Sequence, residues 1–265
     1  MHITRTDEQW KLLEEADPTV PIVMVNLIRF REQALDGYGC DGMTGEQAYA
    51  EYGRRLRALA SDFPGSAFWV GEAKTTFIGP EDETWDLVLL VSYNSVSIFR
   101  EMLASEVYQA AATARTAAVL DSRLLLTHET LHVGDAMARW ASAGKAEAEQ
   151  PIVMLNLIRY REMALVDHTC DGMTGEQAYI EYIRRLEAMD SHDFPGTVIW
   201  SGEAETTVIG PPDERWDRVL LVAYESVDEL KRMGGSEAYQ AAGPARTAAV
   251  DDSRLVLMHQ SFPRS

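Results

Sequence analysis

The chain of 265 residues contains two copies of one sequence. The segment PIVMVNLIRFRE at 21–32 returns as PIVMLNLIRYRE at 151–162, and CDGMTGEQAY at 40–49 returns unchanged at 170–179. Each copy has about 110 residues, which is the size of a small domain. The duplication therefore predicts a fold made of two similar units.

The duplication also divides the chain into parts. We expect a leading helix within residues 1–20, a first ferredoxin-like repeat within 21–128 and a second such repeat within 151–260. Residues 129–150 lie between the repeats and are rich in Gly, Ala and Glu, so we interpret them as a linker.

Both copies have the same expected order of elements: strand, helix, strand, strand, helix, strand. Residues 22–30 form a continuous apolar run with one interior asparagine, which is typical of a strand covered on both faces. Thr44 and Gln47 have the spacing of a capping box, so the first helix is expected to begin there and to end at Phe63. The other expected features are strands at 66–78, 85–93, 123–127 and 254–258, a capping box at Ser226 and Glu229, and a break in the later helix near Gly234.

This order of elements is the split β-α-β arrangement called ferredoxin-like. A single unit has its helices on one face of a four-stranded sheet and leaves the other face bare. Residues 87–91 are apolar at consecutive positions, so the second face must be covered as well. Two copies supply that cover when their sheets pack together. The sequence predicts an α+β protein in which two βαββαβ repeats form an intramolecular, pseudo-twofold dimeric α/β barrel.

Composition narrows the class of partner. The chain has 24 Lys and Arg against 42 Asp and Glu, which gives a formal net charge of −18. This charge repels the phosphates of nucleic acids and anionic membranes, so neither is an expected partner. The N-terminal segment is polar, and the apolar run at 88–91 is too short to cross a bilayer. We expect a cytoplasmic protein that binds a small organic molecule; association into a homodimer stays open.

The sequence shows no common cofactor motif. Cys40 and Cys170 do not make a disulfide framework, and there is no Cys-x-x-Cys pair for zinc. A Walker loop, a dinucleotide fingerprint and a Gly-x-Ser-x-Gly motif are also missing from the sequence. We therefore expect neither a metal nor a nucleotide cofactor.

Several short motifs of the first copy resemble a known family. They are Val25-Asn26-Leu27, Arg29-Phe30, Tyr49 with Tyr52, Gly71-Glu72, Trp85-Asp86, Ser105-Glu106, Arg115 and Asp121-Ser122-Arg123. Together they resemble the dimeric α/β barrel superfamily, and in particular its uncharacterised domain family numbered 1330. Members of that family are usually single units that dimerise, so the resemblance implies a fused dimer here. The superfamily includes cofactor-free monooxygenases, lyases, isomerases and haem-handling enzymes, so the resemblance does not name a reaction.

Asn26 and Asn156 are candidate catalytic residues because each is a polar side chain in the middle of an apolar strand. An unpaired buried amide costs about 1–3 kcal/mol, so each side chain must find partners. Either the amides hold a substrate oxygen in a pocket, or they bond to the neighbouring backbone.

Two further pairs are candidate catalytic residues. Tyr93 and Tyr224 end an apolar strand face, where a phenol donates to an oxyanion or packs in the core with its hydroxyl at the rim. His128 and His259 recur at the end of the last strand, and imidazole is the usual general base near neutral pH. The histidines are also compatible with a purely structural role.

Two pairs of arginines are candidate substrate-binding residues. Arg29 and Arg159 lie at the end of the first strand, on the opposite face from the asparagine, and clamp a carboxylate or form salt bridges. Arg115 and Arg246 lie within the apolar segment ARTAAV, where a charge must be paired or reach solvent. Their expected partners are Glu72 and Glu203, either orienting a carboxylate-binding arginine or forming a structural ion pair.

The last candidates for substrate binding are two tryptophans and two aspartates. Trp69 and Trp200 alternate with small residues, so their inward face either leaves room for an apolar cavity or lets another element approach closely. Asp41 and Asp171 lie in the repeated glycine-rich loop beside the cysteines. Tyr49 and Tyr52 have helical spacing and are interpreted as packing residues.

Two functions fit these observations. The first is an enzyme without a metal or nucleotide cofactor, a lyase, isomerase or oxygenase that acts on a small, partly apolar organic molecule of specialised metabolism. The second is a non-catalytic protein that binds a small ligand or assists an enzyme complex, since no nucleophile and base are recognisable as a pair.

Overall fold

The structure is a computed structural model that describes residues 1–58, 64–141 and 150–263. Its strands are hydrogen-bonded in the order β1-β3-β2-β8-β5-β7-β6-β4, and the order closes because β4 also pairs with β1. The fold predicted from the sequence, a dimeric α/β barrel of two ferredoxin-like repeats, is confirmed.

The first repeat follows α1 (Asp7–Glu15) and comprises β1 (Ile22–Phe30), α2 (Gly45–Ala58), β2 (Ser66–Ile78), β3 (Leu87–Tyr93), α3 (Val96–Ala104), α4 (Glu106–Ala118) and β4 (Val119–His132). The second follows η1 (Gly134–Trp140) and comprises β5 (Ile152–Tyr160), α5 (Gly175–Glu187), β6 (Thr197–Ile209), β7 (Arg218–Tyr224), α6 (Val227–Gly235), α7 (Glu237–Ala249) and β8 (Val250–Phe262).

The helix starts follow the expected caps. The Gln47 amide nitrogen donates to Thr44 Oγ1 and the Thr44 amide nitrogen donates to Gln47 Oε1, so the predicted capping box is present at α2. Ser226 accepts a hydrogen bond from the Glu229 amide and caps α6, while Glu229 Oε2 has no partner among the described residues. The predicted break in the later helix is confirmed, because α6 ends at Gly235 and α7 begins at Glu237.

Some boundaries differ from those expected. Strand β4 continues to His132 and is followed by η1, so part of the segment interpreted as a linker is regular structure. The rest of that segment, 142–149, lies outside the described residues, as does Phe63 at the expected end of the first helix. Among the described residues, no helix combines the length and the apolar character needed to cross a membrane.

The chain forms two compact units, and neither corresponds to a single repeat. The first unit consists of Met1–Ala73, Thr84–His128 and Ala204–Glu214, so it contains the end of β6 from the second repeat. The second unit consists of Lys74–Glu83, Glu129–Glu203 and Arg215–Ser265, so it contains the end of β2 from the first repeat. Each unit therefore incorporates one strand end and the turn that follows it from the other repeat.

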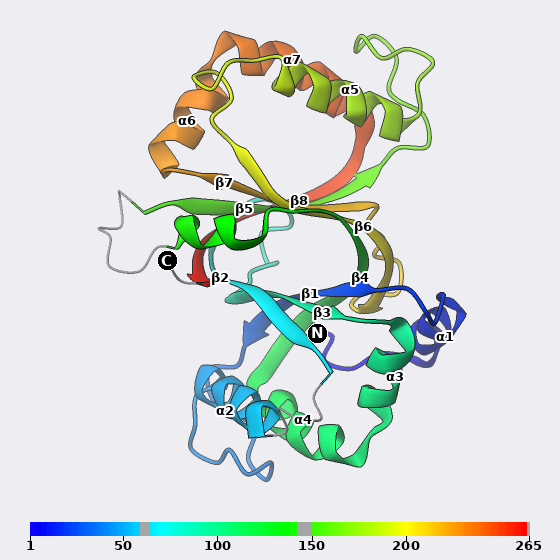
Figure 1. The fold of residues 1–265 in the computed structure, drawn as a ribbon, viewed down its shortest axis with the longest axis vertical. Coiled ribbons are helices and arrows are strands. Elements are labelled where there is room, and N and C mark those ends of the chain that lie inside the picture. Colours follow the sequence, from blue (N-terminus) through cyan, green and yellow to red (C-terminus); the bar gives the residue numbers. More distant parts are fainter. Residues whose placement is uncertain (59–63, 142–149, 264–265) are drawn as a thin grey trace. The chain divides into compact units, whose positions relative to one another are not determined.

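In the first unit, β1 pairs antiparallel with β3 on one edge and with β4 on the other. Helices α2, α3 and α4 lie on the same side of these strands (Figure 1). Val25 and Leu27 on one face of β1 and Met24 on the other are all buried, as expected for a strand covered on both faces. Val208 and Ile209 from the end of β6 pack in one apolar cluster with Met24 and with Leu13 of α1.

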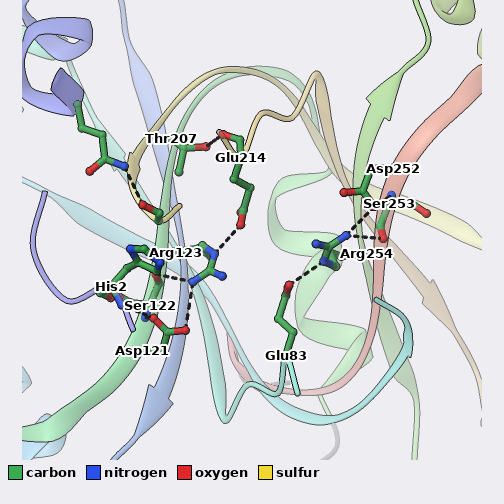
Figure 2. A network of polar contacts seen from close by, with 12 residues as sticks. His2, Glu83, Asp121, Ser122, Arg123, Thr207, Glu214, Asp252, Ser253 and Arg254 are labelled. Carbon is green, nitrogen blue, oxygen red and sulfur yellow. Dashed lines mark hydrogen bonds and ion pairs between the residues drawn. The ribbon is translucent and has the colours of Figure 1, made fainter. Parts of the chain in front are cut away.

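A buried ion pair holds the turn that the second repeat contributes to the first unit. Arg123 of β4 donates through Nε to Glu214 Oε2 at 2.7 Å, and the two side chains are 7% and 9% exposed (Figure 2). Asp121 Oδ2 lies 3.3 Å from Arg123 Nη1, and the guanidinium lies over the Trp85 ring. Gly210 at φ +155° fits this approach, because a Cβ there would lie 2.9 Å from Arg123 Cδ.

The second unit repeats this arrangement with its own residues. Arg254 of β8 donates through Nε to Glu83 Oε2 at 2.9 Å, in the turn that follows β2 (Figure 2). Arg254 Nη1 lies 2.7 Å from Asp252 Oδ1, and the guanidinium lies over the Trp216 ring. The motif residues Trp85 and Arg123, which carried part of the family resemblance, thus help to hold the two repeats together.

Replacing Glu214 by alanine is expected to lower the free energy of unfolding by about 2–3 kcal/mol. Among the described residues, the substitution leaves the buried guanidinium of Arg123 with only Asp121 as an anionic partner. Urea denaturation followed by circular dichroism measures the change. Asp213→Ala, at an exposed position of the same turn, is the matched control and should change the stability by less than about 0.5 kcal/mol. Equal losses for the two variants would contradict a special role for the ion pair.

Candidate functional site

The first unit contains a cavity of about 180 Å³ between its sheet and its helices. Met24 and Asn26 of β1 and Leu89, Val91 and Tyr93 of β3 form its floor. Helices α2, α3 and α4, the N-terminal segment, Leu124 of β4 and the end of β6 at Val208 and Ile209 form the rest of the wall. The polar side chains that line it are Thr4, Arg5, Asn26, Tyr49, Tyr52, Tyr93, Tyr108, Arg115 and Thr116.

Strand alternation explains why Asn26 reaches this cavity. Successive side chains of a strand point to opposite faces, so Asn26 shares the helix-covered face with Met24. Its Nδ2 donates to the Met24 carbonyl oxygen at 3.1 Å and lies 3.5 Å from that of Leu89. Its Oδ1 accepts no hydrogen bond from the described residues. The amide is therefore anchored by the backbone and leaves its oxygen available to a donor on a ligand.

Arg115 supplies a cation to the cavity. Its Nη1 donates to the Ile3 carbonyl oxygen at 2.8 Å and its Nη2 to Ser122 Oγ at 3.1 Å. Both acceptors are neutral, and within the described part of the chain no carboxylate pairs with Arg115. The expected pairing with Glu72 is therefore not what positions this arginine. Its uncompensated charge can stabilise a negative charge nearby, while the Ile3 carbonyl oxygen occupies Nη1.

Four tyrosines surround the same space. The hydroxyls of Tyr52 and Tyr108 lie 3.2 Å apart. Burial raises the pKa of Tyr49 to about 12, although the charge of Arg115 acts in the opposite direction. Burial also raises the pKa of Tyr52 and of Tyr93. Tyr49, Tyr52 and Tyr93 therefore stay protonated near neutral pH, so they can donate hydrogen bonds but do not act as bases.

The second unit carries a matching cavity of about 160 Å³. Asn156 Nδ2 donates to the Met154 carbonyl oxygen at 3.2 Å, and the hydroxyls of Tyr182 and Tyr239 lie 3.2 Å apart. Arg246 Nη2 donates to Ser253 Oγ at 3.3 Å, with no carboxylate partner among the described residues. Tyr179 and Tyr224 complete the lining, and burial raises the pKa of both phenols, that of Tyr179 to about 12.

The size of the two cavities limits the ligand. An apolar cavity of about 150 Å³ holds one benzene molecule. The cavities here have about 180 and 160 Å³, so each fits a single substituted ring or a compact aliphatic molecule of that size.

Of the predicted site residues, Asn26, Tyr93 and Arg115 meet in the first cavity, and their counterparts meet in the second. The other candidates lie outside both linings. His128 Nε2 lies 2.7 Å from Glu205 Oε2, and His259 is half-buried on β8. Arg29 lies opposite Asp121 in the pairing of β1 with β4, and Arg159 forms a salt bridge with Asp251 at 2.8 Å.

The tryptophan face does not form the cavity. Trp69 is fully buried, and its own ring fills the space beside Gly71, where an added Cβ would lie 2.3 Å from Cη2. Trp200 Nε1 donates to Glu129 Oε2 at 2.8 Å. Both described ring-sized cavities lie instead between the helices and the helix-covered face of the sheet. Side chains on that face leave unfilled space next to the tyrosines of the helices.

Asp41 and Asp171 stabilise the loops in which they lie. Asp41 Oδ1 accepts from the Gly37 amide at 2.6 Å, and Asp171 Oδ1 accepts from the Asp167 amide at 2.9 Å. These contacts account for both carboxylates as parts of the loop structure.

The tyrosines of the helices line the cavities, although their sequence pattern does not mark them as site residues. Tyr49 and Tyr52 lie on the inner face of α2, where the helical spacing fits packing equally well. Tyr108 of α4 belongs to no site expected from the sequence. The signal that could have identified them is the recurrence of three hydroxyl-bearing rings on inner helix faces in both copies, where aliphatic residues would pack as well.

The arrangement favours stabilising an anion over removing a proton. Among the described residues that line either cavity there is no carboxylate and no imidazole. An arginine, a carboxamide and protonated phenols converge instead, and such groups stabilise a negative charge that develops on a bound ligand. The described residues also contain no group of three His, Cys, Asp or Glu side chains placed to hold a metal ion.

No protein-family model and no curated protein matches the chain. Among solved structures, the RPA0582 protein of unknown function from Rhodopseudomonas palustris is 40% identical over 47% of this chain and 94% of its own, with a TM-score of 0.43. An anthrone oxidase-like protein is 9% identical over 93% of each chain, with a TM-score of 0.48. A mutant chlorite dismutase from Candidatus Nitrospira defluvii is 9% identical over 96% of this chain and 95% of its own, with a TM-score of 0.42.

The strand order and the repeated helix-covered sheets define the class as dimeric α/β barrel proteins. Within that class, the identity of 40% over nearly the whole length of the Rhodopseudomonas palustris protein shows that this chain belongs to the same family. Because the function of that protein is unknown, the family gives no activity. The similarities at 9% identity carry no argument about the reaction.

The raised tyrosine pKa values predict how stability depends on pH. An unfolded tyrosine has a pKa of about 10, whereas those of Tyr49 and Tyr179 are about 12 in the folded chain. Between these values the unfolded chain releases protons that the folded chain keeps, so stability is fully present below pH 10 and falls as the pH rises toward 12.

The measurement is the free energy of unfolding in urea between about pH 9 and pH 11. The double variant Tyr49→Phe, Tyr179→Phe should lose part of the fall seen in the parent protein. Tyr38→Phe, at an exposed tyrosine, controls for the loss of a hydroxyl. A parent protein whose stability stays flat over this range would contradict the burial of these phenols.

Proposed function

We propose that each repeat binds a small, partly apolar organic molecule between its helices and its sheet, and that the protein acts on this molecule as an enzyme without a metal or nucleotide cofactor. The observation that supports this most strongly is the pairing of an arginine that lacks a carboxylate partner with an anchored carboxamide. In the first cavity these are Arg115 and Asn26, and both face a ring-sized space.

The proposed reaction proceeds through an anionic form of the substrate, such as a phenolate or an enolate. Arg115 and the hydroxyls of Tyr49 and Tyr108 would stabilise its charge, and Asn26 Oδ1 would accept a hydrogen bond from the substrate. An isomerase or a cofactor-free oxygenase fits this description, as does a lyase that passes through the same anion. Because the described lining residues include no carboxylate or imidazole, the substrate would have to be acidic enough to give its proton to water.

The absence of a carboxylate or imidazole from the described linings also supports a second candidate. On that reading the protein binds the same kind of molecule and does not transform it. Native mass spectrometry of freshly purified protein separates the two. A co-purified ligand that stays unchanged on incubation favours binding, whereas conversion to a product of different mass favours catalysis.

We also propose three features that the sequence motifs and composition suggest. They are the finer resemblance to the domain family numbered 1330, the cytoplasmic location and the assignment to specialised metabolism. The proposed division of the chain into residues 21–128 and 151–260 follows the two sequence repeats. His128 and His259 line neither cavity, so the cavities do not support a catalytic role for them.

Replacing both anchored asparagines tests the site directly. The double variant Asn26→Ala, Asn156→Ala is expected to bind 4-propylphenol about tenfold more weakly. Each substitution removes the side-chain Oδ1 that would accept a hydrogen bond from the phenol hydroxyl. Isothermal titration calorimetry measures the affinity, and thermal melting by circular dichroism shows that the variant stays folded.

Asn94→Ala, at an exposed turn position, is the matched control and should bind as the parent protein does. If the folded double variant binds the phenol as tightly as the parent, the assignment of Asn26 and Asn156 to the site is wrong.

A further inference from the structure

The two cavities carry the same asparagine, arginine and tyrosines but differ beside the arginine. In the first unit the N-terminal residues Ile3, Thr4 and Arg5 form part of the cavity wall. In the second unit Arg246 lines the cavity and also a neighbouring groove of about 550 Å³. Arg115 therefore lies beside the N-terminal segment, whereas Arg246 lies beside the groove.

In the first unit the main chain of the N-terminal segment lies against Arg115. The Ile3 carbonyl oxygen accepts from Arg115 Nη1 at 2.8 Å. The His2 carbonyl oxygen accepts from the Ser122 amide at 2.8 Å and from Ser122 Oγ at 2.9 Å, while the His2 amide donates to Asp121. The chain itself thus supplies the acceptor that a ligand would otherwise offer to Arg115.

The second unit has no such segment against Arg246 among its described residues. His132 and Val133 follow His2 and Ile3 by one repeat length, but β4 ends at His132 and the Val133 amide donates to the Ile199 carbonyl oxygen at 3.2 Å. Arg246 keeps the bond to Ser253 Oγ at 3.3 Å. Its other donors meet no acceptor in the part of the chain that the structure describes.

The remaining charges of the groove are already paired with one another. Asp251 lies 2.8 Å from Arg159 and 3.3 Å from Arg161, and Asp252 lies 2.7 Å from Arg254. Arg254 is also held by Glu83 at 2.9 Å. Arg246 is therefore the guanidinium at the junction of cavity and groove whose charge no described carboxylate offsets.

We propose that the second unit binds an organic acid, with its ring in the cavity and its carboxylate on Arg246 at the mouth of the groove. In the first unit the Ile3 carbonyl oxygen takes the place of that carboxylate on Arg115, and the Arg5 guanidinium lies over the Trp10 ring, so the first site does not bind the acid group. The inference rests on the proposed small-molecule function and adds a substrate class and a difference between the two sites. Arginine suits this role because its planar donors match a carboxylate.

Calorimetric titration with two probes tests the inference on the full chain. The acid probe is 3-(4-hydroxyphenyl)propanoate and the neutral probe is 4-propylphenol. The parent protein is expected to bind one acid per chain. Arg246→Gln should weaken acid binding by about tenfold or more, because a charged hydrogen bond is lost, and should change binding of the neutral probe by less than about twofold. Arg246→Lys keeps the charge and should recover part of the lost affinity for the acid.

The matched variant Arg115→Gln distinguishes the two sites and should leave acid binding at the second site as in the parent. Equal weakening by Arg115→Gln and Arg246→Gln, or two acids bound per chain, would overturn the inference while leaving the proposed function intact. An unchanged acid affinity in folded Arg246→Gln would overturn it as well. If neither probe binds the parent protein, the proposed function fails, and the inference fails with it.

Discussion

The ion pair between Arg123 and Glu214, with its counterpart between Arg254 and Glu83, is the interaction on which this fold depends most. Each pair joins the last strand of one repeat to the turn after the second strand of the other. Moving the charged groups of an arginine and a glutamate from water into the protein interior costs free energy. The attraction between them offsets that cost only when the geometry is good. Here the distances of 2.7 and 2.9 Å and the aromatic rings beneath both guanidinium groups supply that geometry.

The contributed strand ends also complete the two cavities. Val208 and Ile209 of the second repeat line the cavity of the first unit, and Ile78 of the first repeat lines that of the second. Neither cavity is therefore built from one repeat alone. A duplicated chain can keep this arrangement because both copies carry the arginine, the glutamate and the apolar strand end.

Much of the fold could be predicted from the sequence because its signals are local. The apolar run of β1, the capping box at Thr44 and the break before Glu237 are each set by a few neighbouring residues. The duplication then supplied the topology. The exchange of strand ends could not be predicted, because the partners Arg123 and Glu214 are 91 residues apart and their pairing has no periodic signal.

The candidate site could be predicted only in part, for a related reason. Asn26 stood out as a polar residue in an apolar strand, and Arg115 as a charge among alanines. Tyr49, Tyr52 and Tyr108 did not, since a tyrosine on an inner helix face packs well whether or not a cavity lies beside its hydroxyl. The place of the cavity depends on volumes that side chains of several elements leave unfilled, and no single segment encodes that.

Hydrogen exchange followed by mass spectrometry, in the parent protein and in Glu83→Ala, tests most directly whether each unit is completed by the other repeat. We expect peptides that cover residues 74–78 and strand β8 to exchange faster in the variant, because the turn at Glu83 no longer binds Arg254. Peptides of β1 and β3 should exchange as in the parent. Faster exchange of β1 and β3 with unchanged exchange in β8 would contradict the account.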